Sequence, residues 1–94
     1  MDNIYRRVSF MKTEVMRGRA DAAVVFLNDR ISDGLDIEED RVMRNILEGA
    51  ESADVYGRVC ALIGHVIGEK YKTSNQKLVY EMVTGEKLEE TKKA

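Results

Sequence analysis

Apolar residues in the first third of the chain recur at alternating spacings of four and three, the heptad pattern of a helix that packs along one seam. The seam positions are Ile4, Val8, Met11, Val15, Gly18, Ala22 and Val25. A second set of residues widens this seam: Tyr5, Met16, Ala20, Ala23 and Leu27. Asn3 suits the N-cap position, and Gly34 suits the position just past the last turn. The pattern predicts one long helix over residues 3–32 that can touch neighbours on two sides.

Two shorter amphipathic patterns predict further helices. The first begins at Asp36, with Glu39 completing the polar pattern of a capping box, and ends at Gly49. Its expected buried face consists of Val42, Met43, Ile46, Leu47 and Ala50. The other is capped by Thr73 or Ser74, continues to Thr84 and is interrupted by Gly85. Its expected inner face consists of Leu78, Val79, Met82 and Val83.

A helix between these two, expected from Ser52 to Lys72, has every small residue on one side. These are Ala53, Gly57, Ala61, Gly64 and Gly68, which fall within roughly 80° on a helical wheel. Glycine inside a helix costs about 1 kcal/mol relative to alanine, so a closely packed backbone is expected to offset that cost. We therefore expect the small residues Gly18 and Ala22 of the long helix to pack against this side.

Together these patterns predict an all-α fold, a small four-helix bundle-like domain with a long N-terminal helix. A chain of 94 residues without proline suits a single domain built of uninterrupted helices. We assign the domain to residues 1–85 and a charged tail or frayed helix to residues 86–94. The apolar seam and the small residues together provide more helix-packing surface than one short bundle needs. This excess predicts a homo-oligomer. The expected packing or oligomer interface is Val8, Met11, Val15, Gly18, Ala22, Gly57, Ala61, Gly64 and Gly68.

Charge is distributed unevenly along the chain. Residues 31–54 carry eight acidic and two basic side chains, whereas the segments before and after carry a small positive excess. An acidic partner surface is expected at Asp36, Glu38, Glu39 and Asp40, although acidic residues also favour a helix N-terminus. Possible contacts to an anion or partner are Arg6, Arg7, Lys12 and Arg17.

The chemistry-bearing residues do not form a recognisable catalytic or metal motif. His65, the single histidine, has Glu69 one turn away, a pair that more often forms a surface hydrogen bond than a metal site. Cys60, the single cysteine, sits in an apolar stretch without a basic neighbour, so we interpret it as a small buried hydrophobe in a reducing compartment. We expect neither an enzyme, a metal nor a cofactor.

The N-terminus lacks the apolar run of a signal peptide, and the apolar run Val59 to Gly68 is too short to span a bilayer. These features favour a cytoplasmic protein without a membrane association. The function favoured by the sequence is a non-enzymatic protein-binding module, an adaptor, inhibitor or regulator, by analogy one of a mobile element, acting through helical oligomerisation. Two alternatives stay open: a DNA-binding transcriptional regulator using the basic residues of the first helix, and an oligomer that sequesters a small anionic ligand such as a nucleotide. Nucleic acid is disfavoured because of the acidic middle segment.

Overall fold

A computed structural model describes residues 3–35, 37–49 and 54–87, and every regular element in these ranges is a helix. The helices are α1 (Ile4–Ser9), α2 (Thr13–Ser32), α3 (Glu38–Leu47), α4 (Val55–Gly68) and α5 (Ser74–Thr84). The all-α prediction is confirmed, whereas the described chain has one helix more than the four we predicted. None of these helices is both long and apolar enough to cross a membrane.

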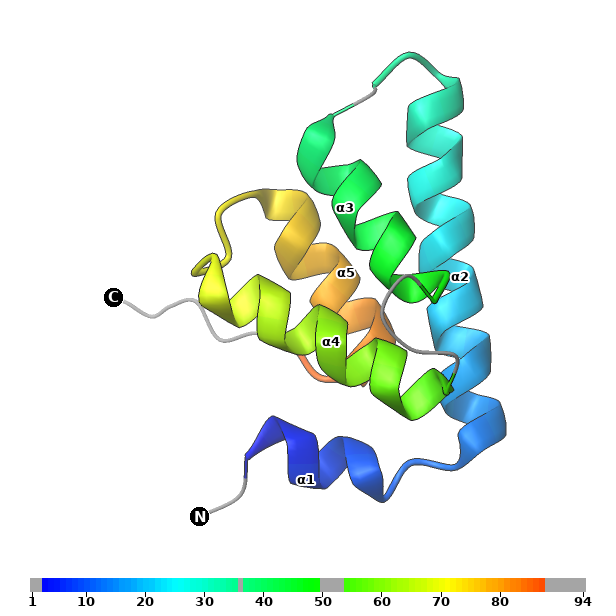
Figure 1. The fold of residues 1–94 in the computed structure, drawn as a ribbon, viewed down its shortest axis with the longest axis vertical. Coiled ribbons are helices and arrows are strands. Elements are labelled where there is room, and N and C mark those ends of the chain that lie inside the picture. Colours follow the sequence, from blue (N-terminus) through cyan, green and yellow to red (C-terminus); the bar gives the residue numbers. More distant parts are fainter. Residues whose placement is uncertain (1–2, 36, 50–53, 88–94) are drawn as a thin grey trace.

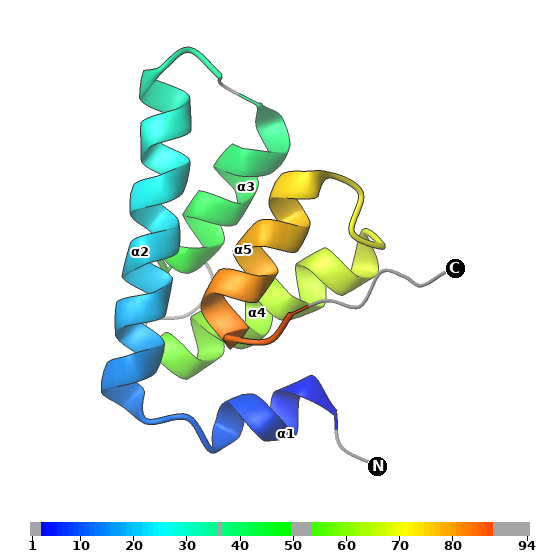
Figure 2. The same ribbon diagram turned by 180° about the vertical axis from the view of Figure 1, so that it is seen from behind.

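α2 forms one edge of the molecule, and the other helices lie on one side of it (Figures 1 and 2). α2 packs against α3, α4 and α5, while α1 lies across the lower end of the molecule beside α4 and the end of α5. Consequently one face of α2 points toward the interior and the opposite face points away from every other helix.

The interior face of α2 carries Met16, Ala20, Ala23 and Leu27, which we call the inner seam. Its members are at most 3% exposed and are spaced by four, three and four residues. The two alanines let neighbouring helices come close to the middle of α2, because a side chain of one carbon occupies little space. The inner seam meets a core of aliphatic residues from the other helices, among them Met43, Leu62 and Val79.

The predicted long helix over residues 3–32 is wrong in one respect, because the chain bends at Phe10–Lys12 and separates α1 from α2. Phe10 and Met11 donate backbone hydrogen bonds back to Arg7 and Val8 as α1 ends. The bend turns Ile4 and Val8 into the core, whereas a straight helix would carry them away from it. Burying one such side chain contributes about 1.5–3 kcal/mol, so tertiary packing overrides the continuous local pattern.

The start of α1, the end of α2 and both ends of α5 follow the sequence closely. The Asn3 side chain accepts a hydrogen bond from the Arg6 N–H, as expected of an N-cap. Thr73 caps α5 and forms a capping box with Gln76. Gly34 follows α2 with a φ of 84°, and Gly85 ends α5 with a φ of 72°, which confirms both as stop positions.

Gly49 follows the end of α3 with a φ of 102°, as expected, whereas the start of α3 and both ends of α4 differ from the predictions. α3 begins with Ile37 at its N-cap and no side-chain cap, while the expected cap Asp36 lies outside the described residues, as does Ala50. α4 is capped by Asp54 and ends at Gly68, before the expected end at Lys72. Lys70 and Tyr71 adopt positive φ angles of 57° and 54°, and their N–H groups bond Ile67 and Val66 in a Schellman-type stop. The expected cap Ser52 and the small residue Ala53 lie outside the described residues.

Candidate functional site

The face of α2 opposite the inner seam carries Val15, Gly18, Ala22 and Val25, which we call the outer seam. All four residues are exposed. Val15 is 42% exposed and Val25 is 58% exposed, although both side chains are aliphatic. The outer seam is the part of the predicted heptad seam that lies in α2, and it continues toward Met11, which is half-buried.

Gly18 of α2 does not meet Gly64 or Gly68 of α4 inside the chain. A Cβ placed on Gly18 or on Gly68 would have no atom within 4 Å, and one on Gly64 would meet only the Tyr5 hydroxyl, at 3.4 Å. The expected packing of small residues of α2 on small residues of α4 is therefore wrong within one chain. The physical reason is that Met16 and Leu27 gain more by burial than Gly18 and Ala22, so α2 turns its larger apolar residues inward.

The remaining predicted interface residues divide between core and surface. Val8 is buried in the core, and Gly57 and Ala61 are half-buried on α4. Gly64 and Gly68 are exposed on the same helix. The small side of α4 thus changes from half-buried to open toward its C-terminus.

The four predicted basic contacts do not share one face, because the bend at Phe10–Lys12 separates them. Arg6 and Arg7 belong to α1, whereas Lys12 is the N-cap of α2 and Arg17 lies on its exposed side. Arg7 is committed to an ion pair with Glu86, with 3.0 Å between Nε and Oε2. The structure therefore does not bring the four basic side chains together on one surface.

The residues of the predicted acidic surface do not form one exposed surface, because packing buries Asp40 and pairs Glu39 with Lys72. Asp40 is 1% exposed and accepts hydrogen bonds from Arg30 Nε at 2.8 Å and from the Asn75 amide, which joins α2, α3 and α5. Glu39 pairs with Lys72 across 3.3 Å, and the pKa of its carboxyl is lowered by its backbone hydrogen bond and then by Lys72. Glu38 stays exposed. An acidic partner surface at Asp40 is thus wrong, because a carboxylate with a guanidinium partner can be buried.

Neither His65 nor Cys60 gains ligand partners in the described part of the chain. The buried Nε2 of His65 has no hydrogen-bond partner there, and Glu69 instead accepts from Gln76 Nε2 at 3.2 Å. Cys60 is a free, half-buried thiol. Across the described ranges, no set of three or more His, Cys, Asp or Glu side chains could hold a metal ion, and no pocket is found.

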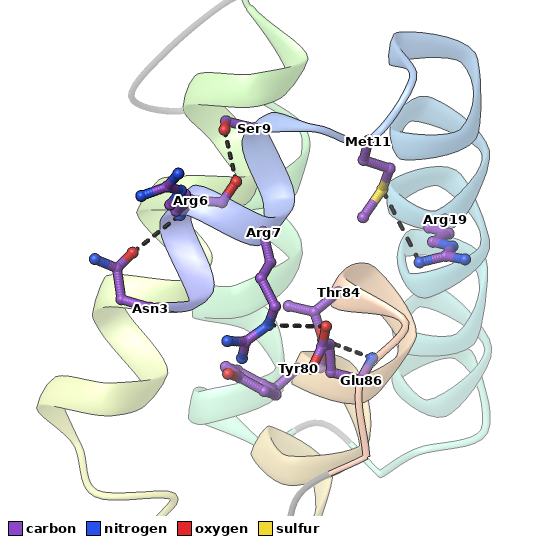
Figure 3. A network of polar contacts seen from close by, with 9 residues as sticks. All are labelled: Asn3, Arg6, Arg7, Ser9, Met11, Arg19, Tyr80, Thr84 and Glu86. Carbon is purple, nitrogen blue, oxygen red and sulfur yellow. Dashed lines mark hydrogen bonds and ion pairs between the residues drawn. The ribbon is translucent and has the colours of Figure 1, made fainter. Parts of the chain in front are cut away.

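A polar contact joins α1 to the end of α5 (Figure 3). Arg7 reaches from α1 over Tyr80 to Glu86, whose backbone N–H bonds the Thr84 hydroxyl. Burial raises the pKa of Tyr80 to about 12, with Tyr71 adding to the rise and Arg7 opposing it. Tyr71 packs edge-on against Tyr80, with ring centroids 5.6 Å apart.

Arg19 supports this junction from α2. Its guanidinium lies 4.0 Å from the sulfur of Met11 and occupies the space that a Cβ on Gly85 would fill. The positive φ of Gly85 favours glycine at this position, and a larger residue would also require the end of the Arg19 side chain to move.

Sequence reasoning missed one surface residue, Phe10. Phe10 is 75% exposed, the highest value among the large hydrophobic residues that the structure describes. Phe10 lies in the bend between α1 and α2. The sequence there contains no glycine or proline that would indicate an interruption of the helix.

Comparison of the chain with protein-family models, with curated proteins and with solved structures found no match. Function is consequently inferred from the surface and the packing of this chain.

Proposed function

We propose that this chain is a non-enzymatic protein-binding module, an adaptor, inhibitor or regulator that holds a helix of a partner protein along the outer seam of α2. The observation that carries the proposal is the outer seam itself, a heptad-spaced apolar stripe on a helix face that no other described element covers. Contiguous exposed apolar residues on a soluble domain commonly mark binding surfaces.

Gly18 supports a close approach by the partner. Glycine in the middle of a helix costs about 1 kcal/mol relative to alanine, and nothing in the described chain fills the space beside it. Gly18 and Ala22 together leave a shallow centre, while Val15 and Val25 supply apolar contact at its two ends. A partner helix with apolar residues at the same spacing fits this shape.

Charge beside the outer seam defines the partner further. Glu14, Asp21 and Asp29 are exposed, and their helical spacing places them along the outer face of α2. A partner helix with lysine or arginine next to its apolar stripe would pair with these carboxylates, which favours selection of partners more than affinity. A cytoplasmic setting is part of the proposal, because the chain's single cysteine suits a reducing compartment.

The test compares two exposed aliphatic residues on different helices. Val25→Glu places a charge on the outer seam, and Leu78→Glu places the same charge on α5 at a residue 41% exposed. Wild type and both variants are used to capture proteins from cells of the source organism, with quantitative mass spectrometry. We expect a protein that wild type and Leu78→Glu retain equally and Val25→Glu loses by at least about tenfold. Capture profiles that do not differ between the two variants would contradict the proposal.

A further inference from the structure

α1 is held on the body of the molecule by contacts that a separate helix could make equally well. Ile4 and Val8 enter the core, the Tyr5 hydroxyl lies beside Gly64 of α4, and Arg7 pairs with Glu86 after α5. We call the surface of α4 and α5 that α1 covers the α1 seat. It is specific, because it combines apolar burial with an ion pair at a fixed place.

The connection between α1 and α2 contains no residue that requires a bend. It consists of Phe10, Met11 and Lys12, without glycine or proline. The apolar spacing of four and three residues continues through it, as expected of one uninterrupted helix. The bent form leaves Phe10 exposed to water, so the bend buries Ile4 and Val8 at the expense of a large aromatic residue.

We propose that two copies of this chain exchange α1, so that each α1 occupies the α1 seat of the other copy. The connection at Phe10–Lys12 becomes helical in both copies and joins α1 to α2. The occupant is a second copy because the α1 seat already fits this helix residue by residue, and exchange of an identical element retains those contacts.

This exchange does not depend on the outer seam being a partner surface. Its interface consists of the α1 seat and the connection, whereas the partner proposed above binds farther along α2. A variant that blocks the exchange therefore leaves the outer seam intact, and Val25→Glu leaves the α1 seat intact.

Thr13→Pro distinguishes the bent chain from the straight one. Thr13 is the first residue of α2 and follows Lys12, which has an extended backbone with φ −63° and ψ 143°. Proline is well suited to this position after an extended residue, but inside a continuous helix it removes a hydrogen bond and clashes with the preceding turn. The matched control is Thr13→Ala, which removes the same side chain and permits both forms.

Sedimentation velocity over a range of protein concentrations gives the first result. We expect wild type and Thr13→Ala to form a dimer of twice 10.7 kDa as concentration rises, and Thr13→Pro to stay folded while its dimer dissociation constant rises at least ~100-fold. A wild type that stays monomeric into the high micromolar range would overturn the proposal, as would a Thr13→Pro dimer as tight as that of wild type.

Cross-linking between two different chains gives a second result that does not require the proline variant to fold. Arg7→Cys and Glu86→Cys are made in separate chains, each carrying Cys60→Ala, then refolded together and treated with a short thiol cross-linker. Because Arg7 and Glu86 are paired at 3.0 Å, exchange predicts a product that joins the Arg7→Cys chain to the Glu86→Cys chain through the two introduced thiols. Mixed dimers that yield no such product would overturn the proposal.

Discussion

The two seams of α2 have almost the same spacing and opposite environments. The inner seam, Met16 to Leu27, is buried against three helices, whereas the outer seam, Val15 to Val25, faces water. The difference lies in side-chain volume, because the inner seam has long residues at its ends and the outer seam has glycine, alanine and valine. The inner seam therefore stabilises this chain by itself, and the outer seam has an apolar surface that its own fold does not use.

Truncation of a large residue on each seam should give the largest contrast. Leu27→Ala removes a fully buried side chain and should lower the free energy of unfolding by about 3 kcal/mol, a large share of the stability of a domain this small. Val25→Ala should change it by less than about 0.5 kcal/mol. Urea unfolding followed by circular dichroism measures both. Equal losses would mean that the outer seam is buried in the folded protein.

Alkaline pH should lower the free energy of unfolding through Tyr80, which belongs to the same hydrophobic core as the inner seam. The pKa of Tyr80 is raised to about 12 in the folded chain, so the folded state favours the neutral phenol. Its contribution is fully present below pH 10 and is lost as pH rises from 10 to 12, at a cost of about 2–3 kcal/mol. Urea unfolding across this range should show a steeper decline for wild type than for Tyr80→Phe. Parallel declines would contradict the assignment to Tyr80.

The inner side of α2 continues beyond Leu27 through the ion pair of Arg30 with Asp40. Asp40→Ala should destabilise the fold by about 2 kcal/mol, because Arg30 and Asn75 lose a charged acceptor. Glu38→Ala, which truncates an exposed carboxylate two residues earlier, is the control and should have little effect. Similar unfolding midpoints for the two variants would show that the buried pair contributes nothing.

Gly18→Ala should change stability less than the truncations of buried residues, and in the opposite direction, and it tests the comparison between the two seams most closely. A Cβ at this position meets nothing within 4 Å, so the change should stabilise α2 by about 1 kcal/mol. The same methyl group would hold a partner helix away from the outer seam and should weaken capture of the partner. A gain in thermal stability without any loss of binding would show that Gly18 does not contact the partner.

The sequence was sufficient for the helical fold and for several helix ends. Asn3, Thr73, Gly34 and Gly85 act at their predicted positions because capping and positive φ are local properties. Schellman-type ends at residues other than glycine are harder to predict, and Lys70 ends α4 earlier than expected for that reason.

Two features could not be predicted from local patterns: the bend at Phe10–Lys12, and which of the two apolar faces of α2 is buried in the core. Both depend on which residues the remaining helices can cover, and the heptad spacing of Val15, Gly18 and Ala22 is equally compatible with a buried face. The burial of Asp40 depends likewise on Arg30 and Asn75, one of which is 35 residues away. The outer seam residues were therefore identified from the sequence as packing or oligomer-interface positions, but which of these positions the chain covers by itself was not.

The outer seam is tested most directly by a photo-reactive amino acid in place of Ala22, at the centre of the seam, in the intact source cells. The same residue in place of Leu78, exposed on α5, is the reference. We predict that position 22 gives a discrete cross-link to one partner protein and that position 78 does not. Cross-linking at position 22 that does not exceed the reference would contradict a protein-binding role for the outer seam of α2.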